Sequence, residues 1–261
     1  MSVLIKLSNL SVANSSLPAL DVTSDDIELA SLPQLTFWLQ AGARFKSGNI
    51  IRERAQGRTI RPAVTSGLDW QNGQFTNGAD ALIVDNNSSH PYVLDDDYHV
   101  NKNAWTMAFV FERSADDVSH AYLTGGVVTQ TAEMKQLFIA MTDAGLKLYS
   151  GDTSPRIQDP RAGKYVGVTL AIVSFSTTNG LTMRINGKEV ARNAADKAPL
   201  TDGRFRLLAS SNNTVGANSS ALGGKIGTIM SFDADLCLPS YRLSLNKLES
   251  ILMTRYGITT L

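Results

Sequence analysis

An Asn-Gly pair between two stretches of strand-like sequence is the feature that most constrains the fold. In residues 181–192, LTMRINGKEVAR, every second residue before the pair Asn186-Gly187 is apolar. Alternation with a period of two is typical of a β-strand that is buried on one side. Asn and Gly both tolerate the positive φ angles of the tight turns that join paired strands. The segment therefore predicts a β-hairpin.

Similar short patterns recur along most of the chain, separated by turn signals such as Asp143-Ala144-Gly145. The expected strands cover residues 35–41, 81–86, 105–113, 120–128, 136–143, 145–152, 165–176, 205–211 and 225–236. Many short strands at this spacing are typical of a sandwich or a barrel. We therefore expect an all-β fold, a two-sheet antiparallel jelly-roll sandwich.

One clear helical pattern closes the chain. Residues 244–256 carry an apolar stripe at helical spacing, with Ser244 as a plausible N-cap and Gly257 at the end. A glycine directly after the last periodic residue is a common helix stop. We expect this helix to belong to a domain that covers residues 34–261.

The first 33 residues differ from the rest, because they are rich in Ser, Leu and Asn and contain no aromatic residue. This composition predicts an extended N-terminal arm. Within the arm we expect a short helix at 25–32, with Asp25 as N-cap and Pro33 at its end. An arm of this kind can attach a domain to a neighbouring subunit by strand addition or surface docking.

Charge and composition exclude several classes of partner. The 24 basic and 24 acidic residues cancel, so no basic surface for nucleic acid is expected. No stretch approaches the ~20 apolar residues of a membrane span, and the N-terminus lacks the apolar core of a signal peptide. We expect synthesis in a cytoplasm and no contact with a membrane. A net charge near zero gives little protection against self-association, which favours a homo-oligomer.

The order of the strand signals resembles the concanavalin A-like lectin and glucanase superfamily, with its LamG-type jelly roll. The most specific part is YVGVTLAIVSFSTTNGLTMRINGKEVAR (165–192), which is similar to the strand, turn and NGK hairpin of that family. The segments WTMAFVFER (105–113) and GLKLYSGD (145–152) are similar to other core strands, and the end of the chain resembles the last strand followed by a helix ending in YGI. The resemblance covers residues 34–258 and implies two antiparallel sheets packed face to face.

As a single domain whose last helix ends in YGI, this chain also resembles structural proteins of tailed bacteriophages. That resemblance implies a non-enzymatic virion component, such as a capsid decoration protein, a head fibre or a tail accessory protein. Its partners would be other virion proteins, such as major capsid or tail subunits, and its location would be the virion after synthesis in the host cytoplasm. The alternative is a carbohydrate-binding module or adhesin that recognises host surface glycans.

The sequence offers no recognisable catalytic set, so we expect no enzymatic activity. Laminarinase-type members of the resembled superfamily carry Glu-x-Asp-x-x-Glu on one strand, and this chain has no such pattern. It also lacks HExxH and G-x-S-x-G. The single cysteine, Cys237, lies in an apolar context without a nearby histidine and is interpreted as a core residue.

Sugar binding would use exposed aromatic side chains, which can stack on the apolar face of a sugar ring. Trp38 and Trp105 lie in apolar strand patterns and are expected in the core. Trp70 lies in GLDWQNGQF, which favours a loop or rim, and Tyr92 and Tyr98 flank an acidic cluster. These three are the candidate carbohydrate-binding residues.

Calcium is the one candidate cofactor, and otherwise none is expected. Asp95, Asp96 and Asp97 precede Asn101 in YVLDDDYHVN, and oxygen ligands in a loop suit Ca²⁺. The spacing does not match a twelve-residue EF-hand loop. A solvated acidic turn between two strands explains the same residues and is the favoured interpretation.

Overall fold

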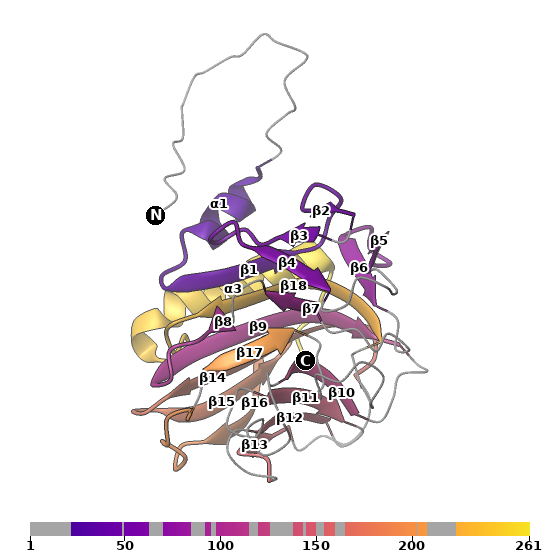
Figure 1. Ribbon diagram of the computed structural model, residues 1–261. Helices are drawn as coiled ribbons and strands as arrows, with labels where there is room; N and C mark the ends of the chain where they lie inside the picture. Colours follow the sequence, from indigo (N-terminus) through magenta and orange to yellow (C-terminus); the bar gives the residue numbers. More distant parts are fainter. Residues whose placement is uncertain are drawn as a thin grey trace, which may run out of the picture.

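The computed structural model of the protein describes residues 22–48, 50–62, 70–84, 92–94, 98–114, 120–125, 138–142, 145–149, 154–159, 165–201, 203–207 and 223–261. Two antiparallel β-sheets face each other, and a long helix covers the outer side of one of them (Figure 1). The expected all-β sandwich is confirmed. Within these residues no helix is long and apolar enough to cross a membrane.

The first sheet contains eight strands among the described residues. In spatial order they are β16 (Lys188–Asn193), β15 (Gly180–Ile185), β14 (Val168–Ser176), β9 (Ala104–Arg113), β18 (Gly224–Phe232), β6 (Asp80–Val84) and β5 (Gln71–Gln74), and β1 (Leu35–Gln40) also pairs with β18. One half of β18 pairs with β6 and the other half with β1, because its register runs from Gly224↔Val84 to Phe232↔Leu35.

The second sheet contains ten described strands, several of them short. In spatial order they are β13 (Ile157–Gln158), β12 (Gly145–Tyr149), β11 (Phe138–Thr142), β10 (His120–Gly125), β17 (Arg204–Leu207), β7 (Tyr92–Leu94), β4 (Thr59–Pro62), β3 (Ile50–Arg52) and β2 (Lys46–Ser47), with β8 (Tyr98–His99) paired to β17. Each strand range expected from the sequence overlaps an observed strand. The sequence patterns do not predict β2 to β5, β7, β8 or β13.

The hairpin expected at 181–192 is present as β15 and β16. Asn186 and Gly187 have φ angles of 47° and 79°, so the turn uses the left-handed conformations that these two residue types accept. The side chain of Asn186 also accepts a hydrogen bond from the backbone N–H of Leu170 at 2.9 Å. The turn is thereby fixed to the neighbouring strand β14.

The main hydrophobic core lies between the two sheets. It joins aromatic residues of the first sheet, among them Phe37, Trp105 and Phe109, to residues of the second sheet such as Phe205. The rings of Phe37 and Phe205 meet edge to face with their centroids 6.4 Å apart. Contacts of this kind across the interior hold the two sheets together.

A second core lies on the outer face of the first sheet, under the C-terminal helix α3 (Arg242–Tyr256). Leu245, Leu248, Ile251 and Leu252 of α3 are buried there, as the apolar stripe predicts. Gly257 ends the helix with φ 63°, also as expected. The expected N-cap is wrong: a short 3₁₀ turn, η1 (Pro239–Tyr241), leads directly into α3, so the helix begins two residues before Ser244.

A short helix, α1 (Ser24–Ala30), lies next to α3 (Figure 1). It is the helix expected at 25–32, but its N-cap is Thr23 rather than Asp25. The Thr23 hydroxyl accepts from the backbone N–H of Asp26 at 3.2 Å, which satisfies one of the free donors at the helix start. The division of the chain into an arm and a domain stays a prediction, since residues 1–21 lie outside the described part.

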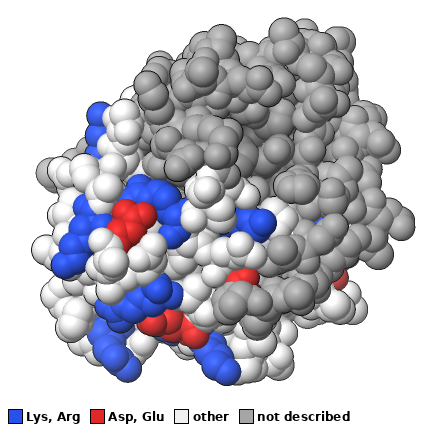
Figure 2. All heavy atoms as spheres, turned by 90° about the horizontal axis from the view of Figure 1, so that it is seen from below, with Lys and Arg blue, Asp and Glu red and all other residues white. Residues whose placement is uncertain are grey.

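Basic and acidic side chains are mixed on one face of the described surface (Figure 2). Figure 2 shows one face from below, where basic side chains lie with acidic ones between them. Arg156 and Asp196 form one ion pair of the protein at 2.6 Å. The mixed charge of this face agrees with the equal numbers of basic and acidic residues in the sequence.

Candidate functional site

A buried carboxylate connects the first described helix to the last one. Asp26 of α1 is 2% exposed, and its Oδ1 accepts from Arg255 Nη2 of α3 at 2.9 Å. The same oxygen lies 3.0 Å from Arg54 Nη1, and Oδ2 lies 3.9 Å from Arg44 Nη2. We call these four residues the Asp26 cluster. Three guanidinium groups thus surround one carboxylate.

The ring of Trp38 and the buried carboxylate of Glu53 hold the loop of Arg54 in this position. Its guanidinium carbon lies 3.8 Å from the centroid of the Trp38 ring, a cation–π contact, and it also donates to the side-chain oxygen of Gln40. The preceding residue, Glu53, is 1% exposed and accepts four backbone N–H groups. These contacts fix the shape of the loop that carries Arg54.

The electrostatics of the cluster favour ionised groups. Burial opposes the charged form of Asp26, but the hydrogen bonds and charges of Arg54 and Arg255 outweigh it and hold the pKa of this carboxyl below its usual 3.8. Burial also lowers the pKa of Arg54, against the opposing effect of Asp26. An arginine remains charged near neutrality despite such a shift. The cluster is therefore a set of ion pairs at neutral pH.

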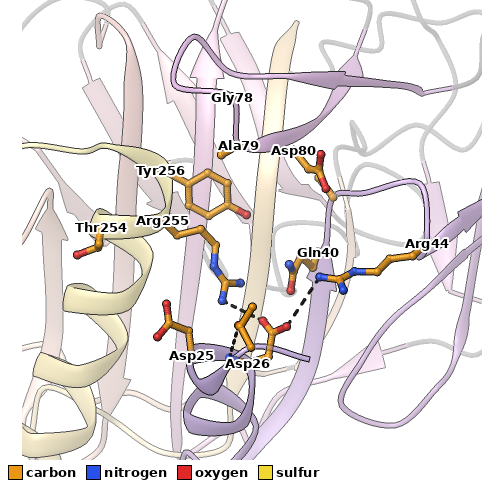
Figure 3. Close-up of a pocket in the computed structure, with 12 residues that line it drawn as sticks. Asp25, Asp26, Gln40, Arg44, Gly78, Ala79, Asp80, Thr254, Arg255 and Tyr256 are labelled. Carbon is orange, nitrogen blue, oxygen red and sulfur yellow. Dashed lines mark hydrogen bonds and ion pairs between the residues drawn. The ribbon is translucent and has the colours of Figure 1, made fainter. Parts of the chain in front are cut away.

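A pocket of about 360 Å³ opens beside the Asp26 cluster. We call it the α1–α3 pocket, because α1 and the end of α3 form two of its walls (Figure 3). The other walls come from the end of β1, the following residues up to Arg44, and the turn between β5 and β6. Its polar lining consists of Thr23, Asp25, Asp26, Gln40, Arg44, Asp80, Thr254 and Arg255.

Contacts between distant segments keep the walls in place. Asn77, in the turn before β6, donates to the backbone oxygen of Arg255 at 3.2 Å. The rings of Phe75 and Tyr256 meet edge to face with centroids 5.5 Å apart. Gly42 has φ 141°, and a Cβ atom there would lie 2.9 Å from Asp80 Oδ2. Glycine thus lets the chain pass close to this carboxylate.

The pocket offers both hydrogen-bond acceptors and donors. Asp25 comes from α1 and Asp80 from β6, and in the described part of the chain neither carboxylate takes part in a hydrogen bond or an ion pair. Arg44, with 42% of its side chain exposed, supplies a guanidinium at the same pocket. A ligand with several hydroxyl groups matches this set, because each hydroxyl can both donate and accept.

The structure corrects the placement of one predicted sugar-binding residue. Trp70 is only 2% exposed and belongs to the core between the sheets, so it is not a rim residue. Its apolar ring is better accommodated by burial than by a surface loop. Tyr92 lies in β7 and Tyr98 in β8, and their side chains fall outside the described part. Trp70 is not among the residues that line the α1–α3 pocket.

The calcium candidates are only partly visible. Asp95, Asp96 and Asp97 lie outside the described residues. Asn101 is described, and its side-chain oxygen accepts from the backbone N–H of Asn103 at 3.0 Å, which is a local turn contact. No cluster of three or more His, Cys, Asp or Glu suited to a metal occurs among the residues that are described. Calcium binding stays a prediction.

Sequence reasoning missed the α1–α3 pocket. Asp26 and Arg255 are 229 residues apart, and no local motif joins them. The available signal was weak: two adjacent aspartates, Asp25 and Asp26, occur in the first turn of a predicted helix. An acidic residue in the first turn commonly stabilises a helix through its dipole. Two adjacent aspartates in the sequence therefore do not reveal that Asp26 is buried.

No protein-family model and no curated protein matches the sequence. Solved structures share the fold at low identity. Domain 4 of AbnA, an extracellular GH43 arabinanase from Geobacillus stearothermophilus, in complex with arabinotriose, is 15% identical with a TM-score of 0.58, over 81% of this chain and 98% of that one. A mutant of Trypanosoma rangeli sialidase displaying trans-sialidase activity is 11% identical with a TM-score of 0.53, over 87% of this chain but only 37% of that one.

The binding domain of botulinum neurotoxin DC in complex with rat synaptotagmin II is also similar, at 11% identity and a TM-score of 0.55, over 82% of this chain and 52% of that one. Two of the three structures come from glycosidases. This finding overturns the expectation that the chain is not an enzyme, because the same fold occurs in structures of glycosidases. Identities this low establish the fold alone. The chain therefore shares a β-sandwich fold with these structures.

Proposed function

We propose that this protein is a saccharide-binding β-sandwich and that its ligand occupies the α1–α3 pocket. One observation carries the proposal. Asp25 and Asp80 line one pocket from different elements, and neither carboxylate is engaged by another described residue. Carboxylates at the wall of a cavity accept hydrogen bonds strongly, and a saccharide supplies several hydroxyl donors at once.

The rest of the lining suits the same ligand. Arg44 and Gln40 can donate to hydroxyl and ring oxygens, and the hydroxyl groups of Thr23 and Thr254 can do both. A pocket of about 360 Å³ lies at the small end of the range for ligand sites. The ligand would therefore be a monosaccharide or the end of a short oligosaccharide.

The comparisons support a saccharide as ligand class. The arabinanase domain has nearly the same extent as this chain and is in complex with arabinotriose. The sialidase is named for its action on a sugar. These proteins share only the fold with this chain. The main support for a saccharide ligand is therefore the polar lining of the pocket.

Calorimetric titration of the full chain with arabinotriose, together with an array of neutral oligosaccharides, tests the proposal. We expect binding that weakens about tenfold in Asp25→Asn and in Asp80→Asn, since each loses a charge-assisted hydrogen bond. Glu189→Gln, an exposed change on β16, is the control and should bind normally. The proposal is wrong if no saccharide binds or if the pocket variants bind like the control. Reducing ends released in the same incubations measure cleavage.

The virion role expected from the sequence is compatible with this site, because a virion component can also bind host glycans. Its partners would be other virion proteins or further copies of this chain, and its location the virion. The test is a deletion of residues 1–20 within a phage that encodes the protein. A particle that incorporates the truncated chain normally would contradict anchoring through the arm.

A further inference from the structure

The α1–α3 pocket is complete only while α1 is docked. Thr23, Asp25 and Asp26 come from α1 and its cap, whereas Arg44, Asp80 and Arg255 come from the rest of the molecule. Figure 3 shows Asp25 and Asp26 on the helix at one side of the pocket and Asp80 on a strand at another. If α1 leaves, the pocket loses one wall.

Among the residues that the structure describes, few contacts hold α1 in place. The helix has seven residues, which is too short for stability on its own. Its buried apolar side chain is Leu29, and Leu32 follows directly after it. Glu28 pairs with Lys247 of α3 at 3.4 Å, but both side chains are nearly half exposed, and exposed pairs contribute little. Docking therefore depends heavily on Asp26.

The ion pairs of Asp26 are themselves not fully satisfied. Asp26 Oδ2 and Arg255 Nη1 are both buried without a hydrogen bond. A buried acceptor and a buried donor that lack partners make the docked state less favourable than a complete network would. The link from α1 to β1 adds a further cost, because Gln34 has φ 61°, a conformation that few residues other than glycine adopt. These features place α1 among the less stable parts of the fold.

We propose that α1 is a detachable wall of the saccharide site and that Asp26 is a positioning residue, so that α1 docking and ligand binding are coupled. The inference rests on the proposed function. A saccharide that contacts Asp25 on α1 and Asp80 or Arg44 on the body binds the docked state only. At ten times its dissociation constant such a ligand lowers the undocked population about elevenfold.

Amide hydrogen exchange of the full chain tests the coupling, with the array's best neutral oligosaccharide as ligand. In the wild type, the ligand should slow exchange at the amides of Ile27 in α1 and of Ser31, its C-cap, by about tenfold and leave the central strand β9 unchanged. This measurement needs no variant. Saccharide binding without slower exchange in α1 overturns the coupling and leaves the proposed function intact, whereas absence of all saccharide binding overturns both.

A second measurement uses the variant Asp26→Asn. It should speed α1 exchange about tenfold without ligand and weaken saccharide binding by a similar factor, with β9 exchange unchanged. Saturating ligand should restore the protection of α1, which a purely structural role of Asp26 would not predict. Glu28→Gln is the matched control on the same helix and should alter neither quantity. Normal affinity in Asp26→Asn together with faster α1 exchange would refute the positioning role.

Discussion

Replacing Glu53 by glutamine tests how the loop behind the α1–α3 pocket is held. Glu53 Oε1 accepts from the backbone N–H groups of Gln56 at 2.7 Å and Arg58 at 3.0 Å. Oε2 accepts from Ala55 at 2.8 Å and Trp38 at 3.3 Å. A glutamine keeps one oxygen and presents an NH₂ group to the other two donors. Two N–H groups therefore lose their acceptor.

Each buried donor that loses its acceptor costs about 1–3 kcal/mol, so we expect the loss of two acceptors in Glu53→Gln to lower the free energy of unfolding by about 2–6 kcal/mol. Urea denaturation followed by tryptophan fluorescence measures the change, and an unchanged m-value would show that the denatured state is unaffected. Glu28→Gln, which removes a carboxylate from an exposed pair, should cost less than about 1 kcal/mol. A loss in Glu53→Gln no larger than in this control would refute the reasoning.

Three further predictions concern other parts of the fold. Burial, followed by a neighbouring negative charge, raises the pKa of Cys237 to about 12, so iodoacetamide at pH 8 should label the folded protein far more slowly than the denatured protein. Gly227→Ala should cost about 1–3 kcal/mol in chemical denaturation, because the new Cβ would lie 2.4 Å from Cε1 of the buried Tyr256 ring. The depressed pKa of Asp26 means that its contribution is complete above the unfolded value near 3.8 and is lost as the pH falls through the lower folded value. The amide spectrum of α1 should therefore stay constant from about pH 8 to pH 5 and change only below about pH 4, as nuclear magnetic resonance would show.

The strands could be predicted from the sequence because their signal is local. In β9, Trp105, Met107 and Phe109 alternate with Thr106 and Ala108, and this period of two marks a strand whatever surrounds it. The pattern does not say what covers each face. Both faces of β9 are buried, one against the opposite sheet and the other beneath α3. The second face is buried although it carries Thr106 beside Ala108.

The candidate site could not be predicted, because its residues meet only through long-range pairing. Asp80 and Asp25 belong to separate elements, and Arg255 approaches them only because α3 packs back across the sheet. Trp70, in contrast, is predicted as a site residue, and the prediction of its position is wrong. Its polar neighbours in the sequence favour a rim position, but the ring is buried in the core. Local polarity describes the neighbours of a residue along the chain, whereas burial depends on neighbours in space.

The pairing of β1 with β18 has a consequence for how the chain is made. Thr228 donates its side-chain hydroxyl to the backbone oxygen of Leu39, 189 residues earlier. During synthesis, β1 therefore emerges long before its partner strand, and Phe37 and Leu39 have no sheet to join until most of the chain has been translated. Contacts of such sequence separation form slowly and leave apolar strands exposed in the meantime. The sandwich should close only after β18 has emerged, and the early strand β1 is the segment that a chaperone on the nascent chain would protect.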